Sequence, residues 1–300
     1  MSTYAYFHQL GWKTRILNSL RAVFRIRLLE HQLQRLARGR MPSSFLARLI
    51  PPEYTYPKPS WREVERHGIH LRLDLSNATD HGVFFDLKDA GDEALFAVVK
   101  DKDIVVDIGA NIGIYSLRFA QLAGKGRVIS FEPHPDTFAR LRDHVRMNGF
   151  EHLIPLQFGI GPRNETLRLY EVVESNSGMN RILPEGSVHP SMVSRSIVVK
   201  PLNEAILTLD LPRIDLIKID VEGFEMDVLH GSEEVIRSFH PVLFIELDDE
   251  NLRVHGTSAS ALVALVRSWG YTVRIAQSNE LVSDKTELHG IAVDILCSPQ

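Results

Sequence analysis

Residues Val105–Gly113 read V-V-D-I-G-A-N-I-G, and this stretch decides the fold. Its apolar start predicts a buried strand over 104–108 that carries an acid, Asp107, near its end. Gly109 and Gly113 then allow a tight turn before a helix that we expect over 112–122. A strand, a glycine turn and a helix in this order are typical of an α/β unit whose loop amides and helix N-terminus face a ligand.

The spacing of the glycines indicates which ligand the turn accepts. A dinucleotide site needs G-x-G-x-x-G, because a pyrophosphate must lie against bare backbone. Here the two glycines are four residues apart, and the carboxylate of Asp107 before them would repel a pyrophosphate. The same carboxylate suits the cationic methionine moiety of S-adenosylmethionine. The sequence therefore favours this cofactor over NAD, and the predicted binding residues of the turn are Asp107, Gly109, Asn111 and Gly113.

Two further positions extend the predicted cofactor site. Glu132 follows a second strand over 127–131, where a carboxylate can accept hydrogen bonds from both ribose hydroxyls. The alternative is an ordinary exposed acid at a strand end. Gly159, in the run Phe158–Gly161, follows a third strand predicted over 153–158, and we expect it to allow close stacking of the adenine. A plain turn is the alternative there.

The rest of the chain continues the alternation of strands and helices. Continuous apolar runs indicate strands that are buried on both faces, as in a parallel sheet. The further predicted strands cover 167–173, 216–219, 242–247, 271–275 and 291–296, and the further helices cover 92–99, 136–148 and 259–269. This order predicts an α/β fold with a mostly parallel, doubly wound, Rossmann-like sheet, whose ligands lie at the carboxyl ends of the strands.

The N-terminal part differs from this core in charge. Residues 1–50 hold nine Lys or Arg and one acid, a net charge of +8, and the remainder carries −12. Apolar residues at three- and four-residue steps predict one or two amphipathic helices before a Pro-rich boundary at 51–59. We therefore expect a basic helical extension with its linker over 1–60 and the catalytic domain over 61–300. Residues 61–90 form its lead-in, a hairpin in which Gly68–Leu75 pairs with Val83–Leu87.

Three partners are compatible with a basic amphipathic extension. It can cap the core or form a homodimer contact, it can lie peripherally on an anionic membrane surface, or it can bind nucleic acid. The acidic core and the lack of an aromatic-rich basic platform disfavour nucleic acid.

Composition limits the remaining possibilities. A length of 300 residues with 44% hydrophobic content suits one large α/β domain with an appendage. No apolar run approaches the roughly 18 residues that span a bilayer, so we expect a cytoplasmic protein, with membrane-surface association as the alternative. Cys297 is the only cysteine, which excludes an internal disulfide and a thiolate zinc site.

Charged residues gather where the fourth and fifth strands end. Asp220 and Glu222 follow the fourth strand, Glu246 lies near the end of the fifth, and Lys218 shares a strand face with Asp220. Methyl transfer needs an aligned acceptor and a base for the acceptor's proton, so these four are the predicted catalytic residues. The same oxygens are ligands suited to Mg²⁺. A structural alternative has Lys218 paired with Glu246 and Glu222 capping the next helix.

The chain resembles the FkbM-type methyltransferase family. The resemblance rests on D-I-G-A-N-I-G, on F-E-P at Phe131–Pro133, and above all on I-D-L-I-K-I-D-V-E-G-F-E at Ile214–Glu225 with V-L-H-G at Val228–Gly231 and F-I-E-L at Phe244–Leu247. It implies a Rossmann-like methyltransferase fold and S-adenosylmethionine-dependent O-methylation of a hydroxyl, commonly on a sugar, glycan or secondary metabolite. Glu93 is similar to an acid that the family places near the cofactor. The chain departs from the family at Pro201–Asn203 and in the loop Ser175–Arg195.

Other functions remain as alternatives. A non-catalytic scaffold could keep the fold without turnover. A nucleic-acid N-methyltransferase commonly has an N-P-P-Y-type turn after the fourth strand, where this chain has I-D-V-E-G. His134, His189 and His255 are further candidates for the base, although a single histidine is more often structural.

Overall fold

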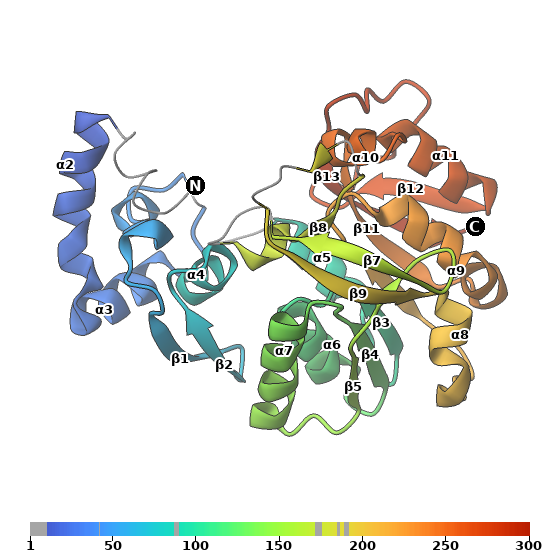
Figure 1. The fold of residues 1–300 in the computed structure, drawn as a ribbon, viewed down its shortest axis with the longest axis horizontal. Helices are drawn as coiled ribbons and strands as arrows, with labels where there is room; N and C mark the ends of the chain where they lie inside the picture. The colour runs from blue at the N-terminus through green and yellow to red at the C-terminus, as the bar shows by residue number, and fades with distance from the viewer. Residues whose placement is uncertain (1–10, 42, 87–89, 172–175, 185–186, 189–191) are drawn as a thin grey trace. The chain divides into compact units, whose positions relative to one another are not determined.

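The computed structural model describes residues 11–41, 43–86, 90–171, 176–184, 187–188 and 192–300. The chain divides into two compact units (Figure 1). Unit 1 comprises residues 1–89 with 173–179, and unit 2 comprises 90–172 with 180–300. His189 and Ser175 lie outside the described residues.

The centre of unit 2 is a mixed β-sheet. Its strands are β3 (Ile104–Ile108), β4 (Arg127–Phe131), β5 (Leu153–Leu156), β10 (Leu216–Ile219), β11 (Val242–Asp248), β12 (Tyr271–Ile275) and β13 (Ala292–Pro299). Their order across the sheet is β12-β13-β11-β10-β3-β4-β5. The strands from β11 to β5 are parallel, and β13 is antiparallel to both of its neighbours. The predicted α/β fold with a mostly parallel sheet is confirmed.

The strand order places a topological switch point beside β3. The chain passes from β3 outward to β4 and β5, and then returns to the other side of β3 as β10. At such a point the connections leave opposite faces of the sheet, which opens a crevice beyond the carboxyl ends of the two central strands. Asp107 on β3 and Asp220 directly after β10 therefore belong to the same edge of the sheet.

Helices cover both faces of this sheet. They are α5 (Ala90–Val98), α6 (Ile114–Ala123), α7 (Pro135–Asn148), α8 (Leu202–Ile206), α9 (Glu225–Phe239), α10 (Asp249–Val254) and α11 (Ala259–Ser268). Ile104, Val106 and Ile108 alternate along β3 and share one apolar core with residues of α9 and α11. The intervening Asp107 points to the opposite face, where it meets Ser116 of α6. Cys297, on β13, is completely buried.

A second, smaller sheet in unit 2 differs from what we predict from the sequence. Its order is β6-β9-β7-β8, with β6 (Gly159–Ile160), β7 (Glu165–Tyr170), β8 (Arg181–Ile182) and β9 (Ser194–Lys200). Gly159 therefore does not end the third strand of the main sheet, because β5 stops at Leu156 and Gly159 pairs with β9. The next residues pass directly over α9, since a Cβ on Gly231 would lie 2.0 Å from the carbonyl oxygen of Gly161.

Unit 1 contains a hairpin and several short helices. The elements are α2 (Trp12–Arg21), the 3₁₀ turn η1 (Ala22–Arg25), α3 (Arg27–Ala37), β1 (Trp61–Arg66), β2 (Ile69–Asp74), α4 (Ala78–Phe85) and the 3₁₀ turn η4 (Ser177–Met179). The predicted pair of amphipathic helices is present as α2 and α3. The hairpin residues group with the N-terminal segment. No helix of the described residues is long and apolar enough to span a membrane.

The predicted partner of the hairpin is wrong. The strand over 69–74 pairs with Trp61–Arg66, not with Val83–Leu87. Val83 instead lies in α4, because the side chain of Asn77 caps this helix by accepting from the amides of Thr79 and Asp80. The apolar run after it turns Phe84 and Phe85 into the core of unit 1.

A buried ion pair joins the two halves of unit 1. Glu30 of α3 is completely buried, and both of its carboxylate oxygens accept from the guanidinium of Arg62 on β1, at 2.6 and 3.2 Å. This bidentate geometry compensates a charge that could not remain buried alone.

Candidate active site

The glycine turn after β3 is held against the loop after β10. Gly109 has φ of 85°, and the amides of Gly109 and Ala110 both donate to the carbonyl of Phe131 at 3.0 Å. A Cβ on Gly109 would lie 1.8 Å from the carbonyl oxygen of Asp220. Only glycine allows this contact, so the residue lets the ends of β3 and β10 lie close together.

Gly113 allows a close approach between two helices. Its φ is 91°, and it stands directly before α6. A Cβ there would lie 2.4 Å from Cδ1 of Leu141 on α7. The glycine therefore allows close packing between two helices, rather than between a helix and a strand.

A polar layer crosses three neighbouring strands beneath the turn. Lys218, Asp107 and Ser130 lie side by side in register on β10, β3 and β4. Asp107 Oδ2 accepts from Ser116 Oγ at 2.5 Å, and Ser116 Oγ accepts from Ser130 Oγ at 2.8 Å. Nζ of Lys218 lies 2.9 Å from Asp220 Oδ2 and 3.8 Å from Asp107 Oδ1. The layer is an ion-paired network in an otherwise apolar sheet.

Burial and charge act in opposite directions on this layer. Burial raises the pKa of Asp107, and the ammonium of Lys218 opposes that rise. Burial works to lower the pKa of Lys218, but the carboxylates of Asp220 and Asp107 outweigh it and leave the pKa raised. Lys218 is therefore a fixed cation that is unsuited to act as a base.

Two buried oxygens at the turn have no hydrogen-bond partner among the described residues. They are Oδ1 of Asp107 and Oδ1 of Asn111, which has φ of 49°. Buried polar atoms are normally paired, so such orphans indicate where a ligand donates. Both atoms belong to residues that we predict to bind the cofactor.

Glu132 links the second strand to the turn. It is 7% exposed, so it is not an ordinary surface acid. Its Oε2 accepts from the amide of Asn111 at 2.9 Å and its Oε1 from the amide of His134 at 2.8 Å. Burial raises the pKa of Glu132 to about 7, against the lowering effect of these two amides. Each oxygen keeps a second lone pair that can accept from a ribose hydroxyl.

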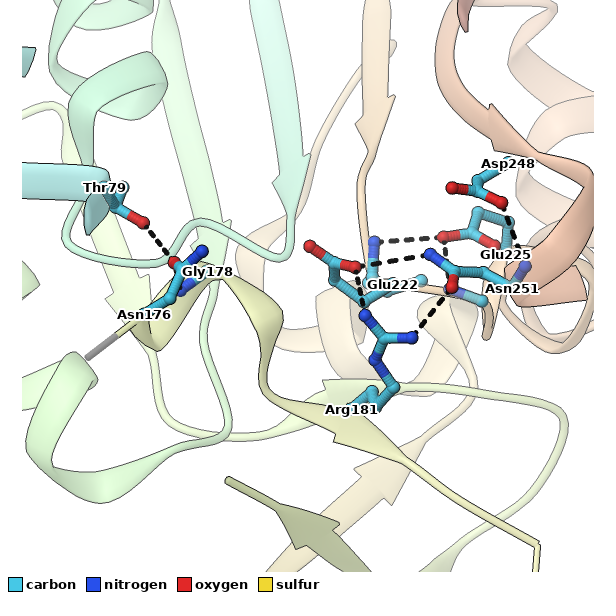
Figure 2. A network of polar contacts seen from close by, with 10 residues as sticks. Thr79, Asn176, Gly178, Arg181, Glu222, Glu225, Asp248 and Asn251 are labelled. Atoms are coloured by element: carbon cyan, nitrogen blue, oxygen red, sulfur yellow. Dashed lines mark hydrogen bonds and ion pairs between the residues drawn. The ribbon is translucent and has the colours of Figure 1, made fainter. Parts of the chain in front are cut away.

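Glu222 is held by a residue that the sequence analysis does not predict. Arg181 of β8 donates to Glu222 Oε2 at 3.1 Å and to Asn251 Oδ1 at 2.8 Å, and Asn251 also donates to Glu222 at 3.4 Å (Figure 2). The backbone of Glu222 has φ of 57°, in the left-handed region that residues other than glycine seldom adopt. Burial and the charge of Asp220 raise the pKa of Glu222 to about 7, while Arg181 lowers it.

Two more carboxyl groups complete the cluster. Glu225 is buried and accepts from the amides of Val221 and Gly223, which closes the turn after β10. Burial and, to a lesser extent, the charge of Asp220 raise the pKa of Glu246 to about 10. Its Oε2 has no hydrogen-bond partner among the described residues. At neutral pH Glu246 is thus a neutral acid that can donate a hydrogen bond.

The structural alternatives for this cluster do not match the contacts. The ion pairs of Lys218 are with Asp220 and Asp107, not with Glu246. Glu222 does not cap α9, whose N-cap residue Phe224 makes no side-chain capping bond. Among the residues that the structure covers, no group of three or more His, Cys, Asp or Glu is arranged for a metal ion.

Other predicted residues have varied positions. Glu93 is exposed on α5, whereas its neighbour Asp92 accepts from the hydroxyl of Tyr115 at 2.8 Å. The ring of Tyr115 lies over Lys218, with 4.6 Å from Nζ to the ring centroid. Gly159 lies beside Pro133, since a Cβ on it would be 3.8 Å from that ring. Asp92 therefore connects α5 to the polar layer through Tyr115.

Two of the predicted histidines, His134 and His255, lie within the described residues. Nδ1 of His134 accepts from the amide of Thr137 and caps α7, and its Nε2 lies 3.5 Å from Glu171 Oε1. His255 packs edge-on against Phe224 and lines a cavity of about 450 Å³ between α9 and α11. Among the described residues, neither of these two histidines has a hydrogen bond to the polar layer.

Comparisons with known proteins agree with this geometry. Residues 107–273 match the methyltransferase FkbM domain. Hexuronic acid methyltransferase AglP of Haloferax volcanii is 28% identical over 150 residues, which is 50% of this chain and 58% of AglP. The chain thus spans little more than half the length of that relative. The 31-O-demethyl-FK506 methyltransferase FkbM of Streptomyces tacrolimicus is 30% identical over 221 residues, 63% of this chain and 80% of that protein.

A solved structure is also similar to this chain, at lower sequence identity. The crystal structure of methyltransferase FkbM from Methylobacillus flagellatus KT has a TM-score of 0.43 and 18% identity, covering 66% of this chain and 44% of that chain. The domain match includes the glycine turn, Glu132 and the carboxylate cluster after β10. The chain therefore belongs to the FkbM methyltransferase domain family.

Proposed function

We propose that this protein is an S-adenosylmethionine-dependent O-methyltransferase that acts on a hydroxyl of a sugar, glycan or secondary metabolite. The observation that carries the proposal is a pair of buried oxygens at the switch point of the sheet, Asp107 Oδ1 and Asn111 Oδ1, that accept no hydrogen bond from the described residues, although Lys218 Nζ lies 3.8 Å from the first. They require a ligand that donates hydrogen bonds and tolerates negative charge. An amino-acid ammonium group, a sulfonium and ribose hydroxyls together meet that requirement.

Different residues in and beside the turn would bind different parts of the proposed cofactor. Asp107 and Asn111 would hold the methionine part, and Glu132 would accept from the ribose hydroxyls with its remaining lone pairs. Gly159, beside Pro133, leaves space for the adenine. The ammonium of Lys218, 2.9 Å from Asp220 Oδ2 and 3.8 Å from Asp107 Oδ1, would balance part of the negative charge beside the cofactor.

Glu222 is the proposed general base. A base works best when its pKa lies near the operating pH, and that of Glu222 is raised to about 7. S-adenosylmethionine supplies an electrophilic methyl group on sulfur. As the acceptor oxygen bonds to that carbon, the bond from the carbon to sulfur would break and leave a neutral thioether, and Glu222 would take the hydroxyl proton. Asp220, fixed by Lys218, orients the acceptor, and the neutral Glu246 donates a hydrogen bond to the same cluster.

The relatives support the class of acceptor. Hexuronic acid methyltransferase AglP acts, by its name, on a sugar acid, and the Streptomyces tacrolimicus protein is named as a methyltransferase of 31-O-demethyl-FK506. The second name indicates transfer to oxygen. The I-D-V-E-G turn agrees with them because it presents carboxylates, which accept a hydroxyl proton.

Isothermal calorimetry with S-adenosylmethionine and S-adenosylhomocysteine tests the cofactor part. We expect the wild type to bind both. Glu132→Gln should weaken binding at least tenfold, because the amide group of the new side chain would face the two backbone amides, of Asn111 and His134, that donate to Glu132. Glu280→Gln, an exposed acid of unit 2, is the matched control and should bind as the wild type does. If the wild type binds neither nucleoside, the protein is a scaffold and the proposal fails.

Turnover with a labelled methyl group tests the catalytic part. A panel of hexoses, hexuronic acids and RNA should yield labelled sugar ether and no labelled RNA. With the best acceptor, Glu222→Gln should lower kcat roughly 10²–10⁴-fold while nucleoside affinity stays within about twofold. Asp220→Asn should also lower kcat. Normal turnover in Glu222→Gln would assign the base to another residue.

A further inference from the structure

Helix α2 of unit 1 is amphipathic, but its polar face is buried and its apolar face is exposed. Its one buried residue is polar, Asn18, which is 4% exposed and donates to the hydroxyl of Tyr54 at 3.1 Å. On the same side, Nε of Arg21 donates to the carbonyl of Arg48 at 2.6 Å. The helix is therefore attached to its unit by hydrogen bonds rather than by an apolar face.

The apolar face of α2 points to solvent. Trp12, Ile16 and Leu20 recur every four residues on one side of the helix and are 69%, 54% and 66% exposed. The following residues continue this character, with Val23, Ile26, Leu28, Leu36, Met41 and Phe45 all exposed. Soluble proteins seldom expose so many large apolar side chains in one segment, which marks an interaction surface. We call residues 12–45 the exposed apolar segment.

The exposed ionic charges of the exposed apolar segment itself have one sign, and one of them, Arg38, pairs with Asp86 at 2.9 Å. Residues 1–50 contain nine Lys or Arg, and their single acid, Glu30, is fully buried against Arg62. Lys13, Arg27 and Arg35 are exposed among the apolar positions. Every exposed ionic charge in 11–41 and 43–50 is therefore positive.

This charge distribution selects among three partners. A homodimer through this surface would bring two segments of net charge +8 face to face. Nucleic acid would satisfy the arginines but leave Trp12, Ile16 and Leu20 against phosphates. An anionic lipid surface satisfies both features, because headgroups pair with the basic side chains while apolar ones enter the acyl boundary.

We propose that the exposed apolar segment docks the protein on the anionic phospholipid surface of a bilayer. Helix α2, dark blue in Figure 1, lies in the plane of the interface, with Trp12, Ile16 and Leu20 below the headgroups and the arginines at their level. Residues 1–10 lie outside the described part of the chain, so the tests use the full-length protein. This inference does not depend on the proposed methyl transfer.

Vesicle co-sedimentation tests the proposal. We expect at least tenfold stronger binding to vesicles of phosphatidylcholine with one quarter phosphatidylserine than to phosphatidylcholine alone, because anionic headgroups attract each basic residue. The double variant Ile16→Asp with Leu20→Asp should lose at least tenfold of that affinity. Leu207→Asp is the matched control, since Leu207 is 79% exposed on unit 2, and it should bind as the wild type does.

Fluorescence gives a second readout at the proposed contact. The emission of Trp12 should shift to shorter wavelength on anionic vesicles, and Trp12→Phe should remove that shift although Trp61 and Trp269 remain. Both Asp substitutions are at exposed positions, so the far-ultraviolet circular dichroism spectrum should be unchanged.

Three results would overturn the proposal. They are equal binding to neutral and anionic vesicles, unchanged vesicle binding by the double variant, and a vesicle-free dimer that the double variant dissociates. The last would show that the segment is an interface between two copies of the chain.

Discussion

Arg181 shows how one side chain sets the chemistry of another. Its guanidinium reaches Glu222 and Asn251 from the second sheet, while its Nε is buried without a hydrogen-bond partner among the described residues. Burial and Asp220 favour the protonated form of Glu222, and Arg181 favours the carboxylate. The balance leaves Glu222 with a pKa of about 7, near the pH at which a general base is most effective.

Arg181→Gln should therefore change how activity depends on pH. Without the guanidinium the pKa of Glu222 rises, by about one unit or more for a lost opposite charge at this distance. The base form is then reached only at higher pH, so the ascending limb of the kcat profile should move upward. At pH 6 kcat should fall, and near pH 9 it should approach the wild-type plateau.

The conservative variant separates charge from structure. Arg181→Lys keeps the positive charge. The ascending limb of its kcat profile should therefore stay within a few tenths of a pH unit of the wild-type position. A uniform loss of kcat at every pH in Arg181→Gln would mean that Arg181 only supports the fold of β8. A limb that stays in place in that variant would remove Glu222 from the role of base.

At the level of residues, the sequence predicts side chains that directly follow strands and misses those that reach across. Asp107, Glu132 and Asp220 are predictable, because strand ends at a switch point share one edge of the sheet. Arg181 and Asn251 are 41 and 29 residues away from Glu222 and lie in segments without a recognisable motif. Ser116 and Ser130, whose positions on α6 and β4 face Asp107, could in principle have been predicted as its partners. Serine is too common a residue, however, for its presence alone to indicate a hydrogen bond to Asp107.

At the level of elements, the site depends on two turns in contact. The turn after β3 and the turn after β10 approach so closely that the position of Gly109 has no room for a side chain. The contact means that a shift of β10 against β3 moves Asp220 and the cofactor turn together.

Gly109→Ala should break this contact. The new Cβ would lie 1.8 Å from the carbonyl oxygen of Asp220, and φ of 85° is strained for any other residue. The combined strain and overpacking should cost about 3 kcal/mol or more of unfolding free energy. Chemical denaturation measures this loss, and calorimetry should show that nucleoside binding is also weakened.

A second glycine provides the control for Gly109→Ala. Gly149 has φ of 66°, ends α7, and has nothing within 4 Å of an added Cβ. Gly149→Ala should therefore cost only about 1 kcal/mol, the strain of the left-handed conformation. Equal losses in the two variants would contradict the proposed contact between the turns.

Elements with a strong local signal could be predicted, and those defined by pairing could not. β10, β12 and the helix end at Gly149 follow from apolar runs and a left-handed glycine. The hairpin partner was wrong because V-F-F fits a strand as well as a helix, and the Asn77 cap decides for the helix. The four-stranded second sheet depends on long-range pairing between β9 and its neighbours, which no local pattern reveals.

At the level of the whole molecule, two compact units each have their own core. Two cores on one chain favour two unfolding transitions rather than one. The buried pair Glu30–Arg62 belongs to unit 1 only, so it offers a way to destabilise one unit selectively.

Arg62→Met should lower only the transition that belongs to unit 1. Removal of the guanidinium leaves the carboxylate of Glu30 buried without compensation, which typically costs about 3–5 kcal/mol. Differential scanning calorimetry should show one transition at lower temperature and the other unchanged. The control is Arg146→Met, because the pair of Arg146 and Asp143 is mostly exposed and contributes little. A common shift of a single transition would show that the units unfold together.

Cys297 has a practical consequence for following these two units. Its thiol is completely buried in β13, and burial raises its pKa, so it forms little of the thiolate that reacts with alkylating reagents. A cysteine engineered onto an exposed position of either unit would then be the single fast-reacting thiol, without prior removal of the native one. With one such cysteine on each unit, a pair of dyes could be attached. The distance between the dyes could then be followed in solution while vesicles or nucleosides are added.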